Sequence, residues 1–331
     1  MAAFGTVFMP KMALATFENN SWTPSSIVPS DKLEFHPGAH VLHYSSTCFE
    51  GLKAFKHEDG SVNIFRMDAN IQRMAQSGEL LSLPEINKEQ LAQMIKDSVA
   101  LYADDVPSPP GSMYIRPTHV GTEPAIGKAA APSESSALYV LLSPVGDYFS
   151  GGAGALRLLL EEDGMRCAPH MGMIKSGGNY ASALGPIIQA RKACKADQIL
   201  FCPNGDVQET GAANFILIDG NEIITKALDS TFLHGITRDS ILTIARDAGM
   251  TVTERDFTVS ELLERAKKPG TEAALSGTAA VLTPVGTLIH NGQEFPVGSG
   301  EPGETTLKLR QALNDIQWGK AEDKYGWLEK I

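Results

Sequence analysis

Short apolar runs, followed by segments with helical spacing, organise the first half of the chain. The runs predict strands at residues 41–44, 52–56, 62–65, 113–120 and 137–142. Asp59-Gly60 predicts a tight hairpin turn between the second and third of these strands. One helix is predicted from an N-cap at Asp68 to Leu80, and a second from about Lys88 to Tyr102.

The second half of the chain mixes the two periodicities. Strands are predicted at residues 156–160, 198–202, 214–218, 222–225, 272–275 and 280–284. Helices are predicted at about 180–192, 237–248 and 305–317. Asp219-Gly220-Asn221 predicts another hairpin turn. The pattern as a whole indicates an α/β chain, with α and β elements mixed and each domain built from a mixed sheet or barrel with helices.

The length and one glycine-rich segment indicate two domains. A chain of 331 residues is about twice the usual domain size. Ser150-Gly151-Gly152-Ala153-Gly154 is a flexible segment between two apolar strands, as in a linker. We therefore expect a small N-terminal α/β domain at 1–146, a linker at 147–154 and a C-terminal domain at 155–331. The chain contains no internal repeat.

Composition and charge restrict the partners. Hydrophobic residues make up 43 % of the chain and charged residues 20 %, as in folded globular proteins. The formal net charge of −11 argues against nucleic acid, because phosphate neutralisation needs clustered Lys and Arg. An anionic small molecule stays compatible, since it needs only a local positive site.

Targeting, membrane and metal signals are not found. The N-terminus has no basic segment before an apolar core, and no apolar run approaches the roughly 20 residues of a membrane helix. We expect a cytoplasmic protein with no membrane contact. The cysteines at 48, 167, 194 and 202 lack zinc-like spacing with histidine, so we expect reduced thiols and no metal site.

Lys175 lies in the stretch with the clearest chemical signal. It follows an apolar segment and precedes Ser176-Gly177-Gly178, with Tyr180 five residues on. An amine becomes a nucleophile when burial or a nearby cation favours its neutral form. The small residues would leave room for a planar cofactor that this amine can attack. Seen alone, a surface lysine in a glycine-rich turn is the simpler interpretation.

Four further segments suit an anionic, ring-containing cofactor. Arg66 can project toward an anion from the end of a strand, or form a surface salt bridge. Glu209 can hold a ring nitrogen protonated, or simply be solvated. Gly235-Ile236-Thr237 opens a helix whose N–H groups can bind an anion, unless Thr237 is an ordinary N-cap. Ser276–Ala280 is a small-residue turn that offers N–H groups and hydroxyls. Joined with Lys175, these segments match the needs of pyridoxal 5′-phosphate (PLP).

Longer motifs place the chain beside a known family. They lie at residues 44, 48–55, 114–118, 121–124, 142–149, 175–180, 235–238 and 276–279. Tyr114-Ile115-Arg116-Pro117 and Gly177-Gly178-Asn179-Tyr180 are the most specific. Over nearly its whole length the sequence resembles the branched-chain amino acid aminotransferases, which are class IV PLP enzymes of fold type IV. The resemblance implies a homodimer with this two-domain fold.

The resemblance also assigns the cofactor contacts. Lys175 is implied to form the imine with PLP and to shuttle the proton. Tyr180 is implied to bind the phenolic oxygen of PLP, and Glu209 its pyridine nitrogen. The phosphate is implied to contact Arg66, Thr278 and the backbone at Ile236 and Thr237.

A second group of residues is implied to bind the substrate. Tyr114 and the backbone at Thr278 and Ala279 are implied to hold the α-carboxylate. Phe49, Tyr44 and Tyr148 are implied to line the pocket for the apolar side chain. Arg116 resembles the residue that meets the distal carboxylate of glutamate. His170 and Met171 depart from the Gly-Gly-Thr-Gly common in this family, which leaves their effect on substrate range open.

The resemblance implies transamination of leucine, isoleucine and valine with 2-oxoglutarate, which gives branched-chain 2-oxo acids and L-glutamate. Two other class IV activities share the lysine and the phosphate contacts: D-amino acid transaminase and 4-amino-4-deoxychorismate lyase. The segment from Tyr114 to Pro117 argues against both. A scaffold protein that binds PLP without catalysis is the alternative from another class. The preferred branched-chain acid and the direction of the pathway stay open.

Overall fold

The computed structural model describes residues 4–146 and 154–331 and divides into two compact units. The first unit comprises Met1–Tyr148, Ile174–Gly177 and Ile316–Ile331. The second comprises Phe149–Met173 and Gly178–Asp315. Two short segments from later in the chain therefore belong to the first unit. Of the predicted linker at 147–154, only Gly154 lies within the described residues, so that boundary stays a prediction.

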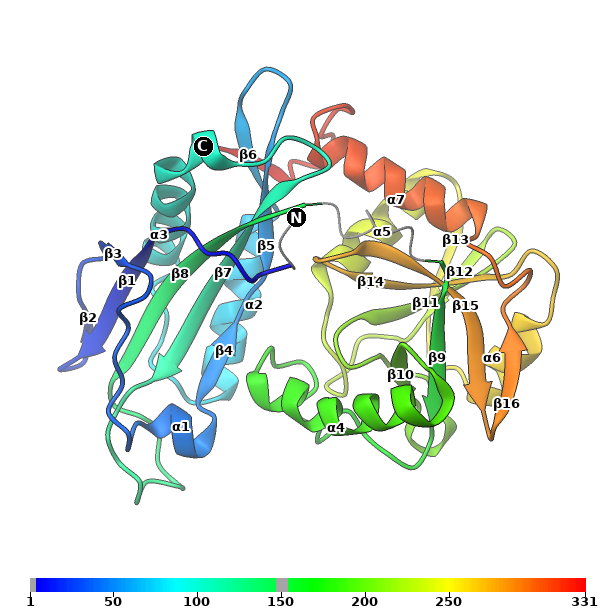
Figure 1. The fold of residues 1–331 in the computed structure, drawn as a ribbon, viewed down its shortest axis with the longest axis horizontal. Helices are drawn as coiled ribbons and strands as arrows, with labels where there is room; N and C mark the ends of the chain where they lie inside the picture. Colours follow the sequence, from blue (N-terminus) through cyan, green and yellow to red (C-terminus); the bar gives the residue numbers. More distant parts are fainter. Residues whose placement is uncertain (1–3, 147–153) are drawn as a thin grey trace. The chain divides into compact units, whose positions relative to one another are not determined.

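The first unit contains a nine-stranded sheet (Figure 1). The strand order is β17-β6-β5-β7-β8-β1-β2, with β3 paired to β1 and β4 to β7. Every pairing among its described strands is antiparallel. The strands are β1 (Lys11–Glu18), β2 (Ser21–Trp22), β3 (Ser26–Pro29), β4 (Thr47–Phe49), β5 (Leu52–Lys56), β6 (Val62–Phe65), β7 (Ser112–Gly121), β8 (Ser136–Val145) and β17 (Leu328–Lys330).

Two amphipathic helices cover this sheet. They are α2 (Met67–Leu80) and α3 (Lys88–Leu101). Their buried residues recur every three or four positions, as at Leu91, Met94 and Ile95, and join the sheet in one hydrophobic core. Asn87 begins α3 by accepting a hydrogen bond from the backbone N–H of Gln90 at 2.9 Å.

Most of the elements predicted for the first half are confirmed, and two details are wrong. Residues 41–44 form part of a short helix, α1 (His40–Tyr44), instead of a strand. Ser45 ends this helix in the left-handed region at φ 54°, and the buried His40 ring anchors it through Ser46 Oγ at 2.9 Å. Asp68 is not the N-cap of α2: Arg66 occupies that position, and Asp68 lies in the first turn.

The second unit contains an eight-stranded mixed sheet in the order β10-β9-β15-β14-β11-β12-β13, with β16 paired to β15 (Figure 1). The pairs β9–β10, β9–β15 and β12–β13 are parallel. The strands are β9 (Leu156–Glu161), β10 (Gln198–Phe201), β11 (Asn214–Asp219), β12 (Glu222–Thr225), β13 (Thr251–Glu254), β14 (Glu272–Gly277), β15 (Val281–His290) and β16 (Gln293–Pro296).

Four helices accompany this sheet: α4 (Gly177–Cys194), α5 (Ile236–Asp247), α6 (Val259–Ala266) and α7 (Glu304–Gln317). The apolar face of α4, with Ala183 and Ile187, packs on Ile199 and Phe201 of β10. Helix α6 contributes Val259 to the core on Phe215 of β11. The predicted α/β class and the mixture of elements are confirmed.

The described part of the chain contains neither a membrane-spanning helix nor a metal-binding cluster. None of its helices is long and apolar enough to cross a membrane. Within residues 4–146 and 154–331, no group of three His, Cys, Asp or Glu side chains is placed to hold a metal ion.

Candidate active site

Lys175 is held by two elements of the first unit. Its backbone carbonyl accepts a hydrogen bond from Phe49 N at 3.0 Å, so the segment runs beside β4. Its backbone N–H donates to Ser77 Oγ on α2 at 3.2 Å. Ser176 forms an antiparallel bridge with Cys48. Because the main chain is fixed on both sides, the half-buried lysine side chain starts from a defined position.

Phe49 brings the lysine together with a second cation. Lys175 Nζ lies 5.2 Å from the centroid of the Phe49 ring, and Arg116 Cζ lies 4.6 Å from it. Arg116 Nη2 donates a hydrogen bond to Tyr114 Oη at 3.0 Å. Arg116 Nε is buried and has no hydrogen-bond partner within the described structure. The first unit therefore gathers four of the predicted site residues.

Tyr114 depends on a glycine for its place. A Cβ atom added to Gly51 would lie 2.0 Å from Tyr114 Oη, so only glycine leaves room for the phenol there. Gly51 follows Glu50, whose two carboxylate oxygens accept hydrogen bonds from Arg73 at 2.7 and 2.8 Å. This buried pair fixes the turn between Phe49 and Gly51.

Tyr44 and Tyr148 are the other two aromatic residues predicted for the substrate pocket. Tyr44 lies on α1, where its hydroxyl donates to the Ile126 carbonyl and its ring contacts those of His40 and His43. These contacts fix Tyr44 beside the loop at 126. Tyr148 lies outside the described residues.

Arg66 begins α2 in an unusual backbone conformation. Its φ is 50°, in the left-handed region that a residue with a Cβ atom seldom adopts. Its backbone N–H donates to the Trp327 carbonyl at 2.7 Å, and its guanidinium lies 5.2 Å from the centroid of the Trp327 ring. The C-terminal segment thus holds this arginine, a contact that the sequence did not predict.

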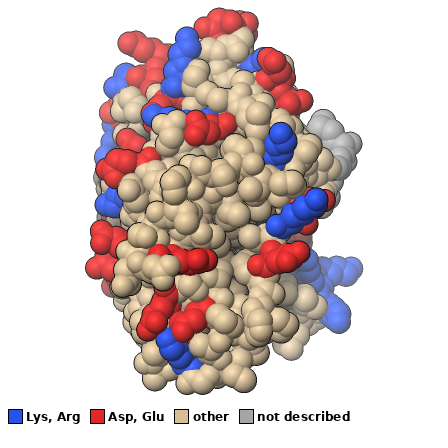
Figure 2. Space-filling model, turned by 90° about the vertical axis from the view of Figure 1, so that its left-hand side faces the viewer, with Lys and Arg blue, Asp and Glu red and all other residues tan. Residues whose placement is uncertain are grey.

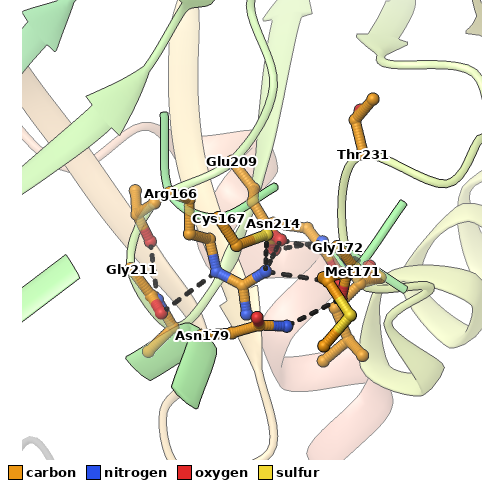
Figure 3. Close-up of polar contacts among 12 residues, drawn as sticks. Arg166, Cys167, Met171, Gly172, Asn179, Glu209, Gly211, Asn214 and Thr231 are labelled. Carbon is orange, nitrogen blue, oxygen red and sulfur yellow. Dashed lines mark hydrogen bonds and ion pairs between the residues drawn. The ribbon is translucent and has the colours of Figure 1, made fainter. Parts of the chain in front are cut away.

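Glu209 lies in a polar network of the second unit (Figure 3). Only 2 % of its surface is exposed. Its Oε1 lies 2.7 Å from Arg166 Nη1 and accepts from Leu233 N at 2.9 Å. Its Oε2 accepts from Asn214 Nδ2 at 3.2 Å. A carboxylate with a cation and two further donors is strongly oriented, and solvation, the alternative for this residue, is wrong.

Arg166 connects Glu209 with Tyr180. The Arg166 guanidinium lies 5.6 Å from the centroid of the Tyr180 ring, at the start of α4. The neighbouring Asn179 donates from Nδ2 to the Met171 carbonyl at 2.7 Å, which ties α4 to the preceding loop (Figure 3). Glu209 and Tyr180, two residues predicted to bind the cofactor, therefore both contact the buried Arg166.

Asn214 connects Glu209 with the start of α5. Its Nδ2 also donates to the Leu233 carbonyl at 2.8 Å. A Cβ atom added to Gly235 would lie 1.9 Å from Asn214 Oδ1, so the asparagine packs directly on the residue that begins α5. The close approach requires glycine at position 235.

The start of α5 offers main-chain donors. Gly235 is the N-cap and α5 has no side-chain cap, so the alternative of an N-cap at Thr237 is wrong. Ile236 and Thr237 form the first turn, whose N–H groups suit an anion. Arg238 holds this turn by donating to the Lys226 carbonyl at 2.7 Å and to Glu254 at 2.9 Å. Burial lowers the pKa of Arg238 below its usual range.

The turn after β14 is the remaining predicted site. Thr278 and Ala279 lie half-buried between β14 and β15. Ser276, the last residue but one of β14, pairs in register with Asn214. Its Oγ is buried without a hydrogen-bond partner in the described part of the chain. A hydroxyl in this state fits a ligand with acceptor oxygens.

The loop that carries His170 and Met171 is constrained at the neighbouring glycine. His170 is exposed and Met171 half-buried. Gly172 is the position in this loop that cannot carry a side chain, because its Cβ would lie 2.0 Å from the carbonyl carbon of Thr231. The loop therefore retains glycine where the close approach requires it.

Three comparisons with known proteins all match this chain to aminotransferases. The model of the family "Amino-transferase class IV" matches residues 47–288. "Branched-chain-amino-acid aminotransferase 2" of Bacillus subtilis is 35 % identical, with 99 % of this chain and 92 % of the relative covered. The "Probable branched-chain-amino-acid aminotransferase" of Streptomyces coelicolor is 37 % identical, with the same coverage.

Solved structures show the same fold. The T.th. branched-chain amino acid aminotransferase with pyridoxamine 5′-phosphate has a TM-score of 0.80 at 27 % identity, with 96 % of this chain and 97 % of that chain covered. The Escherichia coli branched-chain amino acid aminotransferase has a TM-score of 0.78 at 26 % identity, with 92 % and 96 % covered. By family model, sequence and fold, the chain belongs to the class IV aminotransferases and, within them, to the branched-chain-amino-acid aminotransferases.

Proposed function

We propose that the protein transfers the amino group between L-leucine, L-isoleucine or L-valine and 2-oxoglutarate, with PLP as cofactor. The products are branched-chain 2-oxo acids and L-glutamate. The observation that carries the proposal is the Phe49 ring, which has Lys175 Nζ 5.2 Å and Arg116 Cζ 4.6 Å from its centroid. A reactive amine, an apolar ring and a cation for a carboxylate are the groups that such a pair of substrates needs.

The donor set of the second unit fits PLP. Glu209 suits the pyridine nitrogen, since a buried, oriented carboxylate can accept its N–H. The first turn of α5 suits the phosphate through the backbone at Ile236 and Thr237. The unpartnered Ser276 Oγ, on the residue paired with Asn214, supports an oxygen-rich ligand at this place. Solved relatives hold pyridoxamine 5′-phosphate and N-(5′-phosphopyridoxyl)-L-glutamate.

The remaining cofactor contacts follow the same logic. Tyr180 would donate to the phenolic oxygen of PLP. Arg66 and Thr278 would bind the phosphate, whose charge a guanidinium matches with paired N–H donors. When bound, PLP supplies the electron sink for the bond that breaks at the substrate Cα.

The side chains have distinct tasks in the transfer. Lys175 would hold PLP covalently and move the proton at the substrate Cα through its Nζ. Tyr114 and the backbone at Thr278 and Ala279 would orient the α-carboxylate. Phe49, together with Tyr44 and Tyr148, would exclude water from the side-chain pocket, and Arg116 would meet the distal carboxylate of glutamate.

A panel of amino donors tests this function. Steady-state kinetics with 2-oxoglutarate should show turnover of L-leucine, L-isoleucine and L-valine, and none of D-alanine. Turnover of D-alanine without turnover of the branched-chain donors would contradict the proposal and favour a D-amino acid transaminase.

The C-terminal segment should affect cofactor affinity through Arg66. Trp327→Ala removes the ring beside the guanidinium, and cation–π contacts contribute about 0.5–2 kcal/mol. Titration of the apoprotein with PLP should therefore show a Kd roughly 2- to 30-fold higher. Trp318→Ala, in the same segment and half-buried like Trp327, is the matched control. Equal Kd values for the two variants would show that Trp327 does not support Arg66 in binding the phosphate.

We also infer a cytoplasmic homodimer that binds amino acids and 2-oxo acids and contacts neither nucleic acid nor membrane. The free cysteines of the described chain fit a reducing compartment. Basic and acidic side chains lie interspersed around a broad uncharged area on the face shown in Figure 2, which gives no support for binding to a nucleic-acid backbone. Light scattering after size exclusion tests the dimer, and a mass near 35.5 kDa would contradict it.

A further inference from the structure

Arg166 is a buried cation for which the proposed function has no task. Its surface is 2 % exposed, although charged residues are seldom buried unless they are paired. Its Nη1 lies 2.7 Å from Glu209 Oε1, whereas its hydrogen bonds to the carbonyls of Gly211 and Gly172 are both 3.4 Å long (Figure 3). The short ion pair is therefore its main compensation for the loss of water.

The other acidic group in contact with Arg166 is not its counter-ion. Cys167 Sγ lies 3.9 Å from Nη1. Burial raises the pKa of the Cys167 thiol, so this group stays neutral at physiological pH. The negative charge that balances Arg166 is then that of Glu209.

The same guanidinium also touches Tyr180. Its Cζ lies 5.6 Å from the ring centroid, within the range of a cation–π contact. Arg166 itself is fixed at its main chain, where the carbonyl accepts a hydrogen bond from Ser182 Oγ on α4. One buried cation thus contacts both residues that are assigned to polar atoms of the PLP ring.

We propose that Arg166 is a positioning residue that keeps Glu209 ionised and aligned, and so sets the protonation of the PLP ring. The proposal rests on the proposed function, in which Glu209 binds the ring nitrogen. Replacement of the guanidinium by an apolar side chain leaves a buried carboxylate without this cation. Such a carboxylate takes up a proton or moves, and either change alters its interaction with the ring nitrogen.

The test uses the absorption of PLP on the full-length holoenzyme as a function of pH. Glu209→Gln should shift the pH midpoint of the absorption change, because the amide cannot balance a protonated ring nitrogen. Arg166→Met should also shift the midpoint and should lower kcat by roughly ten- to a hundredfold, the effect of one charged hydrogen bond. In Arg166→Met/Glu209→Gln the midpoint and kcat should equal those of Glu209→Gln alone. Arg166→Lys, which keeps the charge, should restore the midpoint toward that of the parent protein.

A buried ion pair elsewhere in the chain provides the matched control. Arg73→Met breaks the pair with Glu50 in the first unit, where Arg73 Nε lies 2.7 Å from Glu50 Oε1. It should lower the melting temperature but leave the PLP midpoint unchanged. If Arg166→Met behaves like this control, the role of Arg166 is only structural and the proposal is overturned.

Two further outcomes separate this inference from the proposed function. Independent, multiplicative losses in the double variant would show that Arg166 does not act through Glu209, and would overturn the inference alone. An unchanged midpoint in Glu209→Gln would reject the assignment of Glu209 to the ring nitrogen, and the inference with it. If Arg166→Met does not fold, Arg166→Lys is compared with Glu209→Gln instead. A pH midpoint of Arg166→Lys near that of Glu209→Gln would show that the positive charge at position 166 does not keep Glu209 ionised, and would overturn the inference.

Discussion

Lys175→Ala is expected to abolish measurable transamination while the protein still folds and binds PLP. The side chain is half-buried, and the main chain at this position is held by Phe49 N and Ser77 Oγ, which the substitution leaves in place. Loss of acid–base catalysis alone lowers rates roughly 10²–10⁴-fold, and the covalent link to PLP is lost as well. Stopped assays with L-leucine and 2-oxoglutarate give the rate, and borohydride reduction followed by peptide mapping locates the PLP-bearing lysine.

The matched control is Lys192→Ala, which removes an exposed lysine of α4. It should retain the rate of the parent protein. Activity of Lys175→Ala within a few-fold of the parent, or borohydride trapping on another lysine, would show that Lys175 is not the reactive amine.

Arg116→Met is expected to raise KM for L-glutamate and 2-oxoglutarate about ten- to a hundredfold, with much smaller effects on L-leucine. The reason is that a carboxylate buried without a cation is costly, whereas an apolar side chain needs no cation. The buried Arg116 Nε without a partner in the described structure fits an arginine that binds an anion. Single-turnover changes in PLP absorption, followed with each donor separately, measure the two half-reactions.

Equal losses for L-leucine and L-glutamate would contradict this assignment, because they would place Arg116 at the α-carboxylate that both donors share. Arg191→Met is the control for the loss of an arginine as such. Arg191 is exposed on α4, where its guanidinium bonds the Asp197 carbonyl, and its removal should leave both half-reactions unchanged.

The fold could be predicted where the apolar periodicity was unambiguous. Strands β5 and β6 match the predicted residues because their apolar runs are short and bounded by Asp59-Gly60. The helix α1 was misread as a strand because five residues carry too little periodicity to separate the two. Strand β17 (Leu328–Lys330) was missed for a different reason. It is three residues long and pairs with β6, more than 250 positions earlier, and no local pattern encodes such a partner.

The candidate site was predictable in its residues but not in its supports. The motifs around Lys175, Arg116 and Glu209 pointed to the reacting groups, and the structure joins the first two at Phe49. Arg166 and Trp327 gave no such signal, because their roles come from contacts at long sequence separation.

In the proposed function, nitrogen moves from a branched-chain amino acid to 2-oxoglutarate. The most direct measurement is to incubate the PLP-loaded protein with ¹⁵N-labelled L-leucine and 2-oxoglutarate and to follow the label by mass spectrometry. We expect ¹⁵N-labelled L-glutamate and the branched-chain 2-oxo acid in equal amounts. Release of the label as free ammonium, or glutamate without the label, would contradict the proposed function.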